Sequence, residues 1–117
     1  MAYMLIAIGG GAGSLVRYKL GKYISEKSSR TFPIGTFIIN ITGAILLGII
    51  GTAAVSNNML LLLGDGFLGA YTTFSTFMYE GFNLFQGKDR LNAFMYIFCS
   101  LILGIIGYIL GTFIGSL

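Results

Sequence analysis

Residues 64–77 of the chain read GDGFLGAYTTFSTF. They lie near the midpoint of an apolar run from Met59 to Leu84, which is long enough for a membrane-spanning helix. Three glycines and four Ser or Thr residues let such a helix open locally and free backbone carbonyls and N–H groups. At membrane depth, freed carbonyls commonly coordinate a cation, and the ends of half-helices can face an anion. The residues alone are equally compatible with an unbroken helix whose hydroxyls bond to preceding carbonyls.

The composition of the whole chain indicates a membrane protein. Of its 117 residues, 56% are hydrophobic and 9% are charged, and the mean hydropathy is +0.87. Soluble domains carry roughly 25% charge, and a chain this short cannot bury so much apolar surface within itself. The lack of histidine excludes imidazole catalysis and imidazole metal ligands. The net charge of +3 does not indicate nucleic-acid binding, because the cations lie in short gaps between apolar runs.

Four apolar segments are long enough to cross a bilayer as helices. They are Ala2–Leu20, Ile34–Ala54, Met59–Leu84 and Leu91–Leu117. The connections between them are short, so consecutive helices should be antiparallel neighbours; they are Gly21–Pro33, Val55–Asn58 and Phe85–Arg90. Pro33 suits the first turn of the second span, where its missing N–H costs nothing. We predict an all-α membrane protein with a single four-span domain, residues 1–117.

The cations lie on one side of this arrangement. Arg17 lies about a turn deeper than the others, which are in or beside the first and third connections: Lys19, Lys22, Lys27, Arg30, Lys88 and Arg90. The side with both termini and the second connection has no Lys or Arg. The positive-inside rule therefore predicts a fixed topology, with the first and third connections cytoplasmic and both termini outside.

Small residues recur one helical turn apart in three of the spans. The pairs and triplet are Gly9-x3-Gly13, Ala44-x3-Gly48 and Gly107-x3-Gly111-x3-Gly115. In lipid, such spacing lets helix backbones approach closely, because packing rather than hydrophobicity drives association. We interpret these residues as helix-packing positions.

Polar side chains inside the spans are the candidates for a functional site, because hydrocarbon offers them no partner. Asn40 lies within the second span, and its amide could donate two hydrogen bonds to an anion or join two helices. Tyr96 and Ser100 are four residues apart and could form one strip of O–H donors or bond between helices. Glu80 is expected to pair with a basic residue, and Arg17 to anchor at the interface or line a positively charged pore mouth.

Phe74 and Phe77 are three residues apart and would share a face of a helix. The edge of an aromatic ring is electron-poor and can face an anion, although phenylalanine in a membrane helix usually only packs. No nucleophile–base pair is present, and the glycine-rich residues 9–13 lack the GK[ST] ending of a phosphate-binding loop. We therefore predict no enzyme. Donors without acidic partners suit an anion pathway.

These residues resemble the small bacterial fluoride channels of the Fluc or CrcB family. The resemblance covers nearly the whole chain and rests on GG-x2-G-x3-RY at 9–18, GT-x3-N-x2-G at 35–43 and G-x2-TTFSTF-x2-E at 69–80. It implies a multi-pass protein of the bacterial cell membrane that forms an antiparallel dimer. Two fluoride pores and a central structural Na+ are implied as well.

The resemblance also assigns roles to residues. The backbone carbonyls of Gly69 and Thr72 would bind Na+, so the third helix should be broken near its middle. The expected pore residues are Asn40 as a donor, Phe74 and Phe77 as ring edges, and Ser75, Thr76, Tyr96 and Ser100 along a polar track; Arg17 would make the vestibule electropositive. Four positions depart from the family pattern: Asp65, Ala70, Tyr71 and Gly104.

The implied function is passive export of F− that relieves fluoride toxicity, with donors replacing water around the ion without holding it too tightly. The strong charge bias predicts that the chain inserts one way and pairs with an oppositely oriented paralogue, rather than with itself. One alternative is a small four-span multidrug/proton exporter, although the first span lacks the acidic residue that such a protein needs. Another is a non-conducting partner subunit of a heterodimeric channel.

Overall fold

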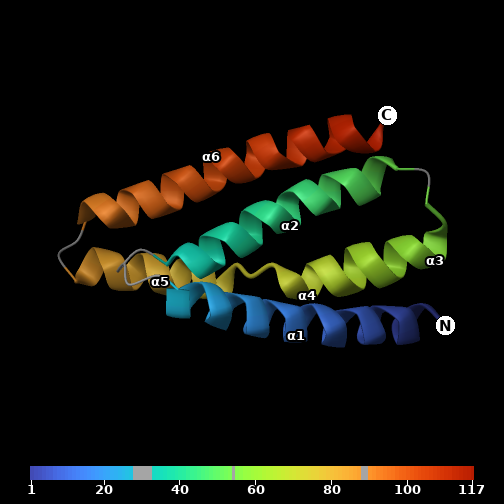
Figure 1. Cartoon of the computed structure of the whole chain (residues 1–117), viewed down its shortest axis with the longest axis horizontal. Helices are drawn as coiled ribbons and strands as arrows, with labels where there is room; N and C mark the ends of the chain where they lie inside the picture. The colour runs from blue at the N-terminus through green and yellow to red at the C-terminus, as the bar shows by residue number, and fades with distance from the viewer. Residues whose placement is uncertain (28–32, 54, 88–89) are drawn as a thin grey trace.

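The structure is a computed structural model that describes residues 1–27, 33–53, 55–87 and 90–117. Within these residues all regular structure is helical (Figure 1). The elements are α1 (Ala2–Lys27), α2 (Ile34–Thr52), α3 (Asn57–Met59), the π-helix η1 (Leu60–Leu68), α4 (Gly69–Tyr71), α5 (Ser75–Gln86) and α6 (Arg90–Gly115). Because α3, η1 and α4 follow one another without interruption, the chain forms four rods, of which the third is broken before α5.

The first rod is longer than the sequence analysis predicted. Helix α1 continues through Lys27 instead of ending at Leu20, because no helix-breaking residue follows Gly21 and the chain can remain helical beyond its apolar part. Gly21 lies against Ile39 of α2, where an added Cβ would be 3.4 Å from the Ile39 Cδ1 atom. The positive charge of Lys27 in the last turn complements the negative end of the helix dipole.

The other helix ends lie within a few residues of the predicted ones. Pro33 precedes α2 rather than lying in its first turn, and its carbonyl accepts a 3.2 Å hydrogen bond from the Phe37 N–H. Helix α2 ends at Thr52, and the predicted end, Ala54, lies outside the described residues. The third rod begins at Asn57 because the Ser56 hydroxyl accepts a 3.3 Å bond from the Met59 N–H and caps the helix.

The closest packing joins alternate rods rather than consecutive ones. Consecutive rods run in opposite directions, with both termini and the α2–α3 connection at one end (Figure 1). However, the most extensive contacts are between α2 and α6 and between α1 and η1, and both pairs are parallel. Consecutive helices are antiparallel neighbours as predicted, since α1 contacts α2, α2 contacts η1 and α5 contacts α6, but the alternate rods pack more extensively. The positions of the small residues explain the difference.

Glycines allow these two parallel pairs to approach backbone to backbone. A Cβ added at Gly9 or Gly13 would collide with carbonyl oxygens of η1, those of Leu62 and Phe67. Between α2 and α6, a Cβ at Gly48 would strike the Tyr108 carbonyl oxygen, and one at Gly111 the Ile45 carbonyl oxygen. The predicted packing role of these glycines is confirmed.

The remaining small positions divide between packing and cavity lining. Gly107 lies against Ile45, and Gly115 against Thr52 and Ile49, as expected for the α2–α6 contact. Ala44, which was predicted to pack in the same way as Gly48, instead lines a cavity.

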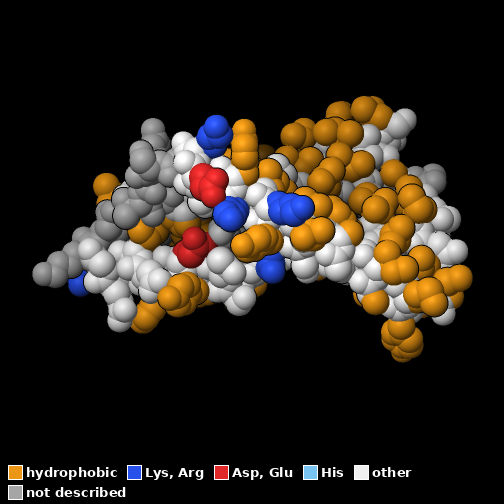
Figure 2. Space-filling view, turned by 60° about the horizontal axis from the view of Figure 1, so that its bottom comes forward, with side chains coloured by type: hydrophobic (Ala, Val, Ile, Leu, Met, Phe, Trp, Pro, Cys, Tyr) orange, Lys and Arg blue, Asp and Glu red, His pale blue; other side chains and the backbone are white. Residues whose placement is uncertain are grey.

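The exterior of the described chain is apolar, and its buried core is small. Only seven hydrophobic side chains are buried, and no polar or charged residue in the described ranges is. Helix α6 exposes large side chains over its length, including Ile105 (62%) and Phe113 (66%). In Figure 2, charged side chains gather toward the end opposite the termini, while the end with the termini is covered by hydrophobic ones. Such a surface suits lipid.

Two of the described helices, α2 and α6, are long and apolar enough to cross a membrane. The third rod is divided into shorter pieces, and α1 ends in a polar, basic segment. The prediction of a membrane protein built from four helical rods is thus supported. The crossing of the bilayer by all four rods stays a prediction.

Candidate functional site

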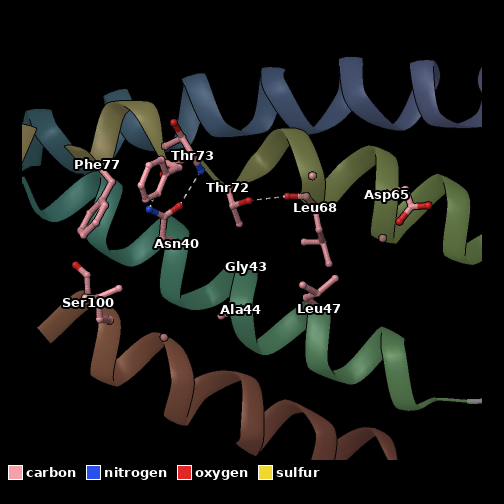
Figure 3. Close-up of a pocket in the computed structure, with 15 residues that line it drawn as sticks. Asn40, Gly43, Ala44, Leu47, Asp65, Leu68, Thr72, Thr73, Phe77 and Ser100 are labelled. Atoms are coloured by element: carbon pink, nitrogen blue, oxygen red, sulfur yellow. Dashed lines mark hydrogen bonds between the residues drawn. The ribbon is translucent and has the colours of Figure 1, made fainter. Parts of the chain in front are cut away.

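The third rod loses its helical geometry at residues 72–74, near its middle. Thr72 is extended, with φ −81° and ψ 160°. The Thr73 N–H donates to the Asn40 Oδ1 atom over 2.9 Å, and the Asn40 Nδ2 atom donates to the Thr73 carbonyl oxygen over 2.9 Å (Figure 3). Asn40 therefore replaces both helical partners that the Thr73 peptide groups would have had. The break expected from the resemblance is present in the structure.

Threonine hydroxyls close the helix ends on both sides of the break. The Thr72 hydroxyl donates to the Leu68 carbonyl over 3.0 Å, beside the 3.1 Å bond from the Thr72 N–H to the same oxygen. On the other side, the Thr73 hydroxyl accepts a 3.3 Å bond from the Thr76 N–H in the first turn of α5. The alternative of an unbroken helix is therefore wrong, although the Thr72 hydroxyl does bond back to a preceding carbonyl.

Gly43 of α2 allows the broken segment to approach Asn40. A Cβ added there would collide with the Thr72 Cγ2 atom and lie 3.3 Å from the Tyr71 ring. The Tyr71 hydroxyl and the Thr42 hydroxyl are 2.9 Å apart and form a hydrogen bond one position away along α2. Gly43 ends the motif GT-x3-N-x2-G, but the spacing within that motif did not indicate that Gly43 contacts the broken segment.

The break frees a backbone carbonyl that would otherwise be bonded inside the helix. In an unbroken helix, the Gly69 carbonyl oxygen would accept from the Thr73 N–H. That N–H donates to Asn40 instead, and Gly69 is exposed at the wall of a cavity. Thr72, the last residue before the extended segment, lines the same cavity. Both residues named for the cation therefore lie where the helix ends.

The cavity has a volume of about 610 Å³ and lies between the third rod, α2 and α6. Six predicted site residues line it: Asn40, Gly69, Thr72, Phe74, Phe77 and Ser100. In Figure 3, Asn40, Phe77 and Ser100 lie toward one end and Asp65 toward the other. Asn40 thus meets residues that follow it by 29 to 60 positions, at one surface that connects α2, the break and α6.

Three aromatic rings follow one another beside the break. The centroids of Phe74 and Phe77 are 6.3 Å apart, and those of Phe77 and Tyr96 are 5.1 Å apart. Phe77 and Tyr96 are buried, whereas Phe74 is 73% exposed because it precedes α5 rather than lying within it. The Ser100 hydroxyl oxygen is buried and has no hydrogen-bond partner among the described residues. Ser100 lines the cavity, and Tyr96 packs behind Phe77, so their sharing of one strip of donors stays a prediction.

Arg17 and Thr76 line a second cavity of about 340 Å³ at the side of the cations. Lys22 of α1 also lines it, together with Thr36 and Thr73. Thr73 lines both cavities, so the segment held by Asn40 lies between them. Ser75 is exposed and lines neither cavity. Arg30 and Lys88, which were counted with the basic residues, lie outside the described residues.

Within the described part of the chain, Glu80 bonds to a hydroxyl of α2. The Thr36 hydroxyl donates to the Glu80 Oε1 atom over 2.5 Å and joins α2 to α5. Within the described residues Glu80 forms no ion pair, and Arg30 and Lys88 lie outside them, so its pairing with a cation stays a prediction. Sequence reasoning missed Thr36 as a partner, although it stands four residues before Asn40 and so lies near the same face of α2.

Comparison with known proteins identifies relatives over the full length of the chain. A family model described as "CrcB-like protein, Camphor Resistance (CrcB)" matches residues 4–112. A protein of Clostridium acetobutylicum named fluoride-specific ion channel FluC 2 is 61% identical over 100% of both chains. A FluC 2 of Bacillus cereus is 42% identical over 100% of this chain and 99% of its own, and a FluC 1 of Ligilactobacillus salivarius is 44% identical over 96% and 97%.

Proposed function

Because the chain belongs to the CrcB-like protein family, we propose that it is a fluoride-selective passive ion channel that carries F− out of the cytoplasm. The names of its relatives support the ion, since each of the three is called a fluoride-specific ion channel. The observation that carries the proposal is the cavity at the break, which gathers Asn40, Phe74, Phe77 and Ser100.

Hydrogen-bond donors in this cavity could replace the hydration shell of a small anion. One Asn40 N–H is used by the Thr73 carbonyl, and an amide nitrogen carries two, so one remains for the ion. The buried Ser100 hydroxyl has no partner among the described residues and can donate as well. The ring edges of Phe74 and Phe77 add weak positive potential. Such a graded set can bind F− loosely enough to release it.

The cytoplasmic approach is proposed to be the second cavity. Arg17 and Lys22 give it positive charge, and Thr76 adds a hydroxyl donor. Ser75 and Tyr96 complete the proposed track on α5 and α6, where Tyr96 packs under Phe77. A passive pathway suffices for export. In acidic surroundings fluoride crosses the bilayer inward as HF, which dissociates in the cytoplasm. The membrane potential then drives the anion out through the channel. We propose no catalytic role for these residues.

The break also fits a structural Na+ held by the backbone carbonyl oxygens of Gly69 and Thr72. Hard cations prefer oxygen ligands, and these two residues lie where the helix ends and carbonyls lose their intrahelical partners. When bound, the ion would supply a positive charge that attracts the carbonyl oxygens at the broken helices of two subunits. One copy offers too few ligands for a cation, which is why the site requires a second, antiparallel copy.

Dimerisation is supported by the surfaces that the single chain leaves open. Phe74 is 73% exposed beside the cavity, and much of α6 is exposed and apolar. The one-sided positive charge further predicts a bacterial cell-membrane protein with its termini outside that pairs with an oppositely oriented paralogue. Accessibility of tags at both termini tests this orientation. Equal inside and outside populations of the chain expressed alone would contradict it.

The alternative of a multidrug/proton exporter lacks its expected acidic site, since the one carboxylate of α1, Glu26, is exposed near the helix end. A non-conducting partner subunit would not need Asn40, Phe74 and Phe77 at one cavity.

Fluoride efflux from liposomes that contain the purified protein tests the channel directly. We expect efflux of fluoride but not of chloride, with protein-free liposomes as the baseline. Fluoride efflux at that baseline, with and without an oppositely oriented paralogue, would refute the proposal.

A further inference from the structure

Asp65 carries the one ionisable side chain among the residues that line the 610 Å³ cavity. It lies in η1, the π-helical part of the third rod, within a segment that the family resemblance leads us to place in the membrane. Ionised groups in such segments are costly, and they are retained where they pair with another charge or serve a site. Asp65 is therefore expected either to pair with another charge or to serve a site.

The geometry of the third rod places Asp65 on the same wall as the freed carbonyls. The cavity is lined by residues that recur every four positions along the rod: Gly64 and Asp65, Leu68 and Gly69, Thr72 and Thr73. This recurrence marks one face of the helix. Figure 3 shows Asp65, Leu68 and Thr72 in succession along that face. Gly69 and Thr72 follow Asp65 by four and seven positions, so at a rise of no more than about 1.5 Å per residue they lie within roughly 6 Å and 10 Å of it along the axis.

Among the described residues, no lysine or arginine lines this cavity to neutralise the carboxylate. The described cations lie at or near the other end of the rods, where Arg17 and Lys22 line the second cavity. Asp65 itself is exposed rather than bonded to a neighbour within the described chain. Gly69 and Thr72 follow it on the same wall, and their backbone carbonyl oxygens cannot donate to a carboxylate.

We propose that Asp65 is an electrostatic determinant of cation binding at the break, attracting Na+ to the Gly69 and Thr72 carbonyls and offsetting its charge. This inference rests on the proposed cation site. The cavity then has two chemical parts. Donors of Asn40 and Ser100 suit the anion at one end, and the Asp65 carboxylate with backbone oxygens suits the cation at the other. For charges about 10 Å apart at an effective dielectric constant near 20, such an attraction changes Na+ affinity on the order of tenfold or more.

Thermal stability of the purified full-length protein in detergent tests the proposal, because a ligand that binds only the folded state stabilises it increasingly as its concentration exceeds its dissociation constant. Unfolding is followed while Na+ is exchanged for N-methyl-D-glucamine at constant ionic strength. We expect the half-saturating Na+ concentration to rise about tenfold or more in Asp65→Asn. It should stay near the wild-type value in Asp65→Glu, which keeps the charge. Glu26→Gln is the matched control, since it removes an exposed carboxylate at the far end of α1.

An unchanged half-saturating concentration in Asp65→Asn would overturn the inference, as would an equal rise in Glu26→Gln. Should Asp65→Asn fail to fold, Asp65→Ser replaces it, and 22Na+ binding to the purified variant gives the affinity directly. Fluoride efflux from liposomes tests the channel proposal separately from the cation site. If fluoride efflux is observed while Na+ changes the thermal stability of no variant, the cation site and the role of Asp65 are both refuted. The channel proposal would still stand.

Discussion

Replacing Asn40 with alanine should destabilise the broken segment, because its amide is the partner of both Thr73 backbone groups. Each of the two hydrogen bonds contributes about 1 kcal/mol net, and a buried group left without a partner costs about 1–3 kcal/mol. The Thr73 groups border a cavity into which water can enter, so part of the second cost is relieved. We expect a loss of about 2–4 kcal/mol in the free energy of unfolding.

Two measurements on the purified protein in detergent check this value. Equilibrium unfolding gives the free-energy difference, and hydrogen exchange reports on the Thr73 amide, whose protection should fall tenfold or more. Asn83→Ala is the matched control, because Asn83 is exposed on α5 and such substitutions usually change stability by less than about 0.5 kcal/mol. If Asn40→Ala unfolds like Asn83→Ala and the Thr73 amide stays protected, the geometry of the break does not depend on Asn40.

Three further substitutions test other contacts. Gly13→Ala should cost about 1–3 kcal/mol in unfolding free energy by forcing α1 away from the η1 backbone, whereas Gly11→Ala, with open space around its added Cβ, should be nearly neutral. Thr36→Val should destabilise by about 1–3 kcal/mol by leaving Glu80 without its hydroxyl donor, and equal stability would show that the 2.5 Å bond contributes nothing. Phe77→Ile should slow fluoride efflux from liposomes while the protein elutes unchanged in size-exclusion chromatography; unaltered flux would remove the ring-edge role.

Several features of this protein follow from its sequence alone, because they depend on local composition. The apolar composition indicates lipid as the surroundings, and the glycine spacing of α1 and α6 predicts close packing, which the contacts at Gly13 and Gly111 confirm. A serine before a helix start, as at Ser56, is also a local signal. The prediction that the first helix ends at Leu20 was wrong for a related reason. The length of an apolar segment measures the part of a helix that suits lipid, and a helix can continue beyond it through polar residues such as Lys27.

The break and its cavity were decided by the tertiary structure. The composition of residues 64–77 permits a helix to open, but it does not determine whether it does, because a freed peptide group needs a partner in an apolar environment. That partner, Asn40, is 33 residues away in the chain, and Gly43 lets it come close. The choice of α2 with α6 as the closest pair, and of Thr36 as the partner of Glu80, depends likewise on which backbones can approach. The sequence supplied the groups of the proposed anion pathway and cation site, and packing in three dimensions brought six of them to one cavity.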